Sequence, residues 1–162
     1  MKLTKISLPL FALALSACVQ TSMPAEQASA TVAPATQVAN AGFSGLLNNF
    51  RASQGKGSVR RVATLDRAAT AHARDMTNRG YFSHDSPGGP NGDDFVARSR
   101  AAGCQMTAGA ENIANGQQSE AEVIEAWKNS TGHRRNMLVS NYTQFGLGRV
   151  GENWVLLLSR SC

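Results

Sequence analysis

The sequence predicts an α+β fold, a three-layer α-β-α sandwich around a small, mostly antiparallel sheet. Apolar residues recur with helical spacing as far as about residue 138, and two strand-like segments follow at the carboxyl end. The last of these, residues 153–159, is apolar on both sides of its pleat over Trp154–Leu158, and such a strand is covered on both faces. We therefore expect helices on both sides of the sheet.

Composition limits the class of protein. The chain has 162 residues, 42% of them hydrophobic and 17% charged, which suits one globular domain of ordinary size. Its net charge is +5, and its arginines are scattered among acidic residues. A dedicated nucleic-acid-binding protein usually shows a basic stripe or arm, so we expect no nucleic-acid partner.

The first 17 residues have the features of a lipoprotein signal peptide. Lys2 and Lys5 precede an apolar run over Leu8–Leu15 that is too short to span a bilayer as a mature helix. The run ends in Leu15-Ser16-Ala17-Cys18, which resembles a bacterial lipobox. We expect lipidation of Cys18 to anchor the protein to a membrane, because more than one acyl chain gives stable anchoring. The alternative is a plain signal peptide in which Cys18 is incidental.

The residue after Cys18 is valine, not aspartate. By resemblance to Gram-negative lipoproteins, this favours the outer membrane. Residues 18–41 then contain the lipidated cysteine and a stretch rich in Ala, Thr, Ser, Gln and Pro, with the single charge of Glu26. Such a segment buries too little apolar area to offset its ordering entropy, so we interpret it as a tether to a domain at 42–162.

Within that domain, local sequence patterns predict the individual helices and strands. Phe43, Leu46, Leu47 and Phe50 predict a helix over residues 43–53. A second helix, over residues 62–79, ends at Gly80, and we expect its His72 to be a partly buried structural histidine.

Further helices are expected over residues 93–102, from a capping box at Ser119-Glu120-Ala121-Glu122, and over residues 131–138. Residues 142–150 and 153–159 read as strands joined by a two-residue turn at Gly151-Glu152.

Besides Cys18, the chain has two cysteines, Cys104 and Cys162. An oxidising compartment would allow them to form one disulfide, and the alternative is two separate thiols. They do not form a Cys-x-x-Cys pair, which argues against a redox-active or zinc-thiolate motif.

Four segments in order resemble the bacterial form of the CAP superfamily of cysteine-rich secretory, antigen 5 and pathogenesis-related proteins, also called SCP-like. They are LDRAATAHARDMTNRGYFSHDSPGG (65–89), GAENIANG (109–116), AWKNSTGHRRNMLVSNYTQFGLG (126–148) and NWVLLLSR (153–160). The similarity covers about residues 43–160, and it implies the same α-β-α sandwich.

The resemblance also implies a cleft lined by His84, Glu111 and His133. The family pattern has a second glutamate three residues after the tryptophan, and here that position is Ser130. Ser130 is therefore expected at the cleft, where it could cap the turn that carries His133. Two neutral imidazoles, His84 and His133, could hold Zn²⁺ or another divalent metal at a weak site. Glu111 could orient one imidazole or take a proton from a metal-bound water.

Without the resemblance, His84 and His133 would read as ordinary loop histidines. With it, the function we favour is an extracytoplasmic binding module for a small or lipid ligand, with no enzymatic activity required. The alternative is a metal-assisted, protease-like hydrolase with Glu111 as its base. Against the hydrolase, the sequence has no HExxH motif and no complete catalytic triad. It does not indicate a protein partner.

Overall fold

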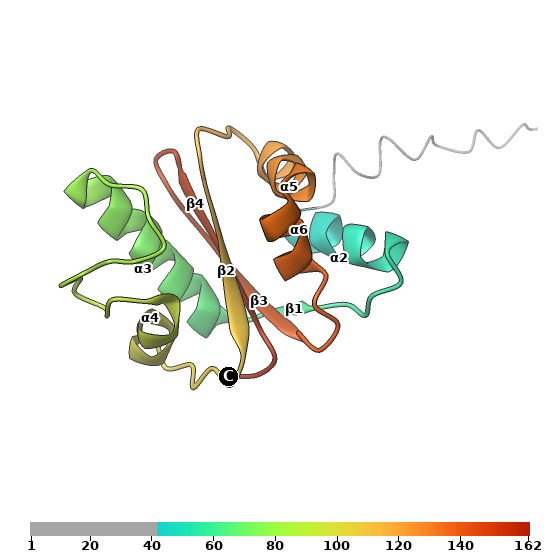
Figure 1. Ribbon diagram of the computed structural model, residues 1–162, viewed down its shortest axis with the longest axis horizontal. Coiled ribbons are helices and arrows are strands. Elements are labelled where there is room, and N and C mark those ends of the chain that lie inside the picture. Colours follow the sequence, from blue (N-terminus) through green and yellow to red (C-terminus); the bar gives the residue numbers. More distant parts are fainter. Residues whose placement is uncertain (1–41) are drawn as a thin grey trace, which may run out of the picture. The chain divides into compact units, whose positions relative to one another are not determined.

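The computed structural model describes residues 42–162. The signal peptide, the lipidation of Cys18 and the tether predicted for residues 1–41 lie outside the described residues. Within residues 42–162, no helix is both long and apolar enough to cross a membrane. The elements shown in Figure 1 are α2 (Phe43–Ser53), β1 (Arg60–Arg61), α3 (Ala63–Arg79), α4 (Phe95–Ala101), β2 (Gly109–Asn115), α5 (Glu120–Asn129), α6 (Thr131–Met137), β3 (Gln144–Val150) and β4 (Asn153–Ser159).

The four strands form one sheet in the order β1-β3-β4-β2. The short β1 pairs in parallel with β3, and the other two pairings are antiparallel. Helices α3 and α4 lie on one face of this sheet, and α2, α5 and α6 lie on the other (Figure 1). The predicted α+β class and its three-layer arrangement are therefore confirmed.

Alternation along β4 divides the core into two parts. Val155 and Leu157 pack with α3 in one apolar cluster. Trp154, Leu156 and Leu158 point to the opposite face and join a second cluster. All five side chains are buried, as expected for a strand that is apolar on both sides of its pleat.

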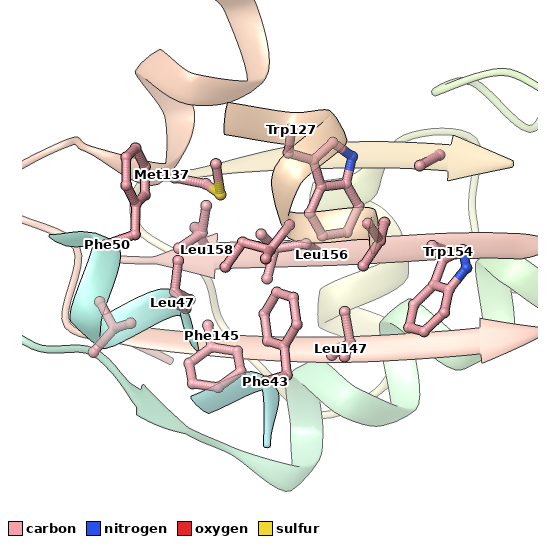
Figure 2. Packing of buried hydrophobic residues seen from close by; sticks show 14 of the residues in the cluster. Phe43, Leu47, Phe50, Trp127, Met137, Phe145, Leu147, Trp154, Leu156 and Leu158 are labelled. Carbon is pink, nitrogen blue, oxygen red and sulfur yellow. The ribbon is translucent and has the colours of Figure 1, made fainter. Parts of the chain in front are cut away.

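Figure 2 shows the second cluster, which α2, α5 and α6 close over the sheet. Phe43 of α2 meets Trp127 of α5 edge to face, with ring centroids 6.1 Å apart. Phe43 also contacts Phe145 of β3. These aromatic contacts join two helices and one strand that are far apart in the sequence.

Two glycines of β3 allow α3 to lie against the sheet at backbone distance. A Cβ built on Gly146 would lie 2.2 Å from the main-chain carbon of Leu65, and one on Gly148 would lie 2.3 Å from the nitrogen of Thr70. Real Cβ atoms do not approach other atoms so closely. Glycine at both positions is therefore required for this helix–strand packing.

Most predicted element bounds hold to within two residues, and the helix at 43–53 and the strand at 153–159 match fully. The turn at Gly151-Glu152 is also present. The helix predicted to end at Gly80 does so, because Gly80 adopts the left-handed conformation with φ of 67°. Ser119 caps α5 through its hydroxyl, which accepts from the amide of Glu122.

Strands β1 and β2 were not predicted. Residues 109–115 read GAENIAN, which neither alternates apolar with polar residues nor forms an apolar run. The segment is nevertheless a seven-residue strand paired along its whole length with β4. Its polar residues are accommodated because neighbouring helices supply hydrogen-bond partners on both faces of the sheet.

Cys104 and Cys162 form a disulfide in the structure. It joins the buried Cys104, in the loop after α4, to the last residue of the chain, just beyond β4. Close by, the amide of Arg160 donates to the carbonyl of Ala108. The carboxyl end of the chain is thus attached to the segment that leads into β2.

Candidate functional site

The loop that carries His84 is attached to α3 through one carboxylate. Asp75 of α3 accepts hydrogen bonds from Tyr81 at 2.6 Å, Ser86 at 2.8 Å and Arg79 at 3.1 Å. Burial raises the pKa of Asp75, but these three donors outweigh that effect, and the net shift is downward. The two ends of the loop segment 81–86 are therefore fixed on either side of His84.

Strand β2 places Glu111 at the centre of the site. Alternation along the strand directs Glu111 to the α3 and α4 face and Asn112 to the opposite face. Only 5% of Glu111 is exposed. Its Oε1 lies 2.9 Å from Nδ1 of His84, and its Oε2 accepts from Nη2 of Arg98, also at 2.9 Å.

The contact with Glu111 determines which nitrogen of the His84 ring carries the hydrogen. Because a carboxylate only accepts hydrogen bonds, Nδ1 of His84 carries the hydrogen, and the neutral ring keeps its lone pair on Nε2. The hydrogen bond to Glu111 raises the pKa of His84, although burial opposes it. The His84 side chain is 53% exposed, so a ligand can reach the ring.

His72 lies close to this pair. It is fully buried, whereas only partial burial was expected. Its Nε2 lies 2.9 Å from the carbonyl oxygen of Ser83 and 3.9 Å from Oε1 of Glu111. Burial lowers the pKa of His72, and the nearby charge of Glu111 compensates only in part. A neutral His72 donating to Ser83 supports the backbone just before His84.

His133 lies in the first turn of α6, and asparagines attach that helix to β2. The side chain of Asn112 donates to the carbonyl oxygen of His133 at 3.1 Å. Asn136 donates to Oδ1 of Asn112 at 2.9 Å and to the carbonyl of Glu111 at 3.4 Å. Burial lowers the pKa of His133, and the charge of His84 lowers it further. Both effects favour the neutral form of the His133 imidazole.

A cleft of about 340 Å³ opens beside these groups. It is lined by His84, Asp85, Asp94, Phe95, Gly109, Ala110, Glu111 and Asn136. The structure thus brings His84 and Glu111 together at the cleft. His133 and Ser130 are not among its lining residues.

Ser130 does not act as predicted. It occupies the position before α6, but its hydroxyl makes no capping hydrogen bond. Its carbonyl instead accepts from the amide of Arg134, as the ordinary first bond of the helix. The expectation that the Ser130 side chain caps the turn carrying His133 was wrong.

Sequence reasoning did not find Arg98. Only 2% of this residue is exposed, although it carries a charge. One signal was available. Arg98 lies three residues after Phe95 and four before Ala102, on the apolar face of a short helix. A charged residue at such a position indicates a buried partner of opposite charge.

The chemistry of the donor set bears on the metal that the family resemblance implies. A carboxylate bound to Nδ1 of a histidine whose Nε2 is open is the arrangement that metal-ligating histidines usually have. His133 supplies a second neutral imidazole. Within residues 42–162, no three His, Cys, Asp or Glu side chains converge as a metal-binding group. Neutral imidazoles of this kind are ligands that a divalent cation such as Zn²⁺ accepts, and a site with only two of them would be weak and completed by water.

Comparison with known proteins identifies a family and two relatives that the chain resembles. The cysteine-rich secretory protein family, CAP, matches residues 45–155. The uncharacterized protein YkwD of Bacillus subtilis (strain 168) is 38% identical over 111 residues, which is 67% of this chain and 42% of YkwD. The uncharacterized membrane protein YlbC of the same organism is 31% identical over 103 residues, 64% of this chain and 29% of YlbC. The chain thus spans less than half the length of both relatives.

Solved structures agree on the fold. An extracellular protein containing an SCP domain, from Bacillus anthracis, superposes with a TM-score of 0.69 at 25% identity, covering 74% of this chain and 39% of that one. An outer surface protein of Borrelia burgdorferi gives a TM-score of 0.63 at 18% identity, covering 72% of this chain and 88% of that one. With a family match over more than half of its length, this chain belongs to the cysteine-rich secretory protein (CAP) family.

Proposed function

We propose that this chain is an exported lipoprotein of the bacterial cell envelope whose CAP domain acts as a binding module. Cys18 is its lipid attachment point, and the cleft beside His84 takes a small or lipid ligand. His84 and His133 hold a divalent cation such as Zn²⁺, whose chemistry when bound is to polarise ligand oxygen atoms. The Bacillus anthracis relative is described as an extracellular protein, which supports export.

One observation carries the choice of binding over catalysis. Both oxygens of the Glu111 carboxylate are already engaged, Oε1 by His84 and Oε2 by Arg98. A general base needs an accessible oxygen within reach of the water or group that it deprotonates. Glu111 is 95% buried and is better placed to orient His84 than to accept a proton from a substrate.

The position of the lipobox supports the anchor. Cys18 stands directly after the apolar run, and Val19 after it supports the outer membrane of a Gram-negative cell. Labelling of cells with radioactive palmitate tests this part. We expect label on the wild-type chain and none on Cys18→Ala. Equal labelling of the two would show that another group, or none, carries the lipid.

Calorimetric titration with Zn²⁺ tests the metal site. We expect about one equivalent to bind the wild-type chain and none to bind the His84→Ala/His133→Ala variant. His72, the third histidine of the chain, is fully buried and serves as an internal control in both proteins. If neither protein bound Zn²⁺, the metal part of the proposal would fail, and lipid and envelope ligands would remain to be tested.

The hydrolase alternative has its own discriminating variant. Wild type should show no turnover of amide or ester substrates with or without Zn²⁺. Hydrolysis that depends on Zn²⁺ and is abolished in Glu111→Gln would replace the binding module with a metal-assisted hydrolase. Glu111→Gln should otherwise only weaken Zn²⁺ binding, because an amide orients His84 less firmly than a carboxylate.

A further inference from the structure

We propose that Arg98 is the positioning residue of the site, and that it holds His84 and Glu111 as one unit. This inference rests on the proposed function in so far as the pair serves to bind a cation. It concerns a residue that touches neither the cleft nor a ligand, since Arg98 is 98% buried behind Glu111 and is not among the residues that line the cleft.

A single nitrogen of Arg98 makes both contacts. Nη2 donates to Oε2 of Glu111 and to the backbone carbonyl of His84, in each case at 2.9 Å. A guanidinium Nη carries two hydrogens, so each acceptor receives one of them. The carboxylate of one residue and the main chain of the other are therefore fixed relative to a common atom.

The same side chain also holds the far end of the His84 loop. Nη1 of Arg98 donates to the carbonyl of Asp93 at 3.2 Å. Asp94 then begins α4 by capping the amide of Ala97 at 2.8 Å. The loop from His84 to Asp93 is thus attached at both of its ends to one planar and rigid group, which is itself held in a capped helix.

The site needs such a residue because its two members come from independent segments. His84 lies on an exposed loop after α3, and Glu111 lies on β2, 27 residues later. The imidazole is half exposed, and the only hydrogen bond that the structure gives its ring is to Glu111. Without Arg98, the Glu111 carboxylate and the backbone carbonyl of His84 would lose the one donor that they share.

The buried charges of Glu111 and Arg98 determine which substitution of Arg98 is informative. Glu111 and Arg98 each have 2% of their side chains exposed. A buried carboxylate that loses its cation is strongly destabilised, so a neutral residue at position 98 tests folding rather than positioning. Lysine keeps the charge but not the planar group with its two separated nitrogens. Arg98→Lys is therefore the informative variant, and Arg100→Lys, an exposed arginine of the same helix, is its matched control.

The test is the ¹⁵N spectrum of the histidine rings in the purified full chain, at a pH of about 9 where imidazoles are neutral. In wild type and in Arg100→Lys we expect His84 as the Nδ1–H form, held by Glu111. In Arg98→Lys, we expect a shift toward the Nε2–H form. Titration with Zn²⁺ alone should show a loss of affinity of about tenfold or more in Arg98→Lys only.

The tautomer readout separates the two proposals. If wild type binds no Zn²⁺, the metal site fails, but the His84 tautomer still tests Arg98. An unchanged Nδ1–H form in folded Arg98→Lys would overturn the positioning role, whatever the affinity. If the role of Arg98 were purely structural, Arg98→Lys would lower thermal stability and leave the tautomer of His84 unchanged.

If Arg98→Lys does not fold, wild type alone provides the answer. The two hydrogens on Nη2 are held by different acceptors, so they should give separate, slowly exchanging proton signals. Arg100 is exposed and should give averaged signals in the same spectrum. Averaged signals for Arg98 would show that the guanidinium is not held, and would refute the proposal.

Discussion

Replacing Gly146 with alanine tests the packing on which the whole α3 layer depends. The added Cβ would lie 2.2 Å from the main-chain carbon of Leu65 and 2.4 Å from the nitrogen of Asp66. Non-bonded carbon atoms prefer separations of about 3.5–4.0 Å, so helix and strand would have to separate by about 1.3 Å. Both neighbours are backbone atoms, which no rotamer change can move aside.

Separation of α3 from β3 would also break a polar contact. The amide of Leu147, next to Gly146, donates to Oδ1 of Asp66 at 2.8 Å. A gap of 0.5–1 Å loses about a quarter to a half of the dispersion energy across an interface. Overpacking alone typically costs about 1–3 kcal/mol. With the lost hydrogen bond, we expect Gly146→Ala to lower the free energy of unfolding by about 3 kcal/mol or more.

Urea unfolding, followed by the fluorescence of the buried residues Trp127 and Trp154, measures this loss. Gly132→Ala is the matched control, since a Cβ there meets nothing within 4 Å and the residue lies inside α6. Alanine should raise stability at that position, by up to about 1 kcal/mol. If the free energy of unfolding of Gly146→Ala lay within about 0.5 kcal/mol of the wild-type value, the close contact between the β3 and α3 backbones would not be what requires glycine at position 146.

Three further predictions concern other buried groups. Arg51 is fully buried and donates to the carbonyls of Gly57, Met137, Val139 and Tyr142. In urea unfolding, Arg51→Met should cost about 3 kcal/mol or more, because these acceptors lose their partner, whereas a change within about 0.5 kcal/mol would contradict that role. Replacing both Cys104 and Cys162 with serine opens a loop of 58 residues and should cost up to about 4 kcal/mol, and a melting temperature equal to that of wild type would count against it. Burial lowers the folded-state pKa of His72, so the unfolded chain takes up that proton first, and stability is lost as the pH falls below the ordinary value of 6.5. His72→Gln should reduce this loss in urea titrations between about pH 6.5 and 5, and an identical pH dependence in both proteins would contradict it.

Local pattern was sufficient for much of the secondary structure. The spacing of Phe43, Leu47 and Phe50 predicted α2, and all three residues are buried. The apolar segment over residues 153–159 predicted a strand covered on both faces, and every residue of β4 is buried. These predictions succeed because burial of an apolar face depends on periodicity along a few turns or pleats, which the sequence shows directly.

Polar burial could not be predicted in the same way. Strand β2 contains Glu111 and Asn112 in succession, and each is buried only because a different helix layer supplies its partner. Arg51 and Arg98 looked like two more scattered arginines, yet both are almost inaccessible to solvent. For Arg51 the acceptors include groups 86 and 91 residues away. No local pattern encodes contacts of that range.

The candidate site shows the same division. Motif resemblance named His84, Glu111 and His133, because the residue types and their order along the chain are properties of the sequence. Tertiary structure decided that Glu111 binds His84 directly, that Ser130 does not act as a side-chain cap, and that Arg98 lies behind the pair. The physical reason is that apolar periodicity determines which faces of the elements are buried. The pairing of buried charges instead depends on how those elements meet in space.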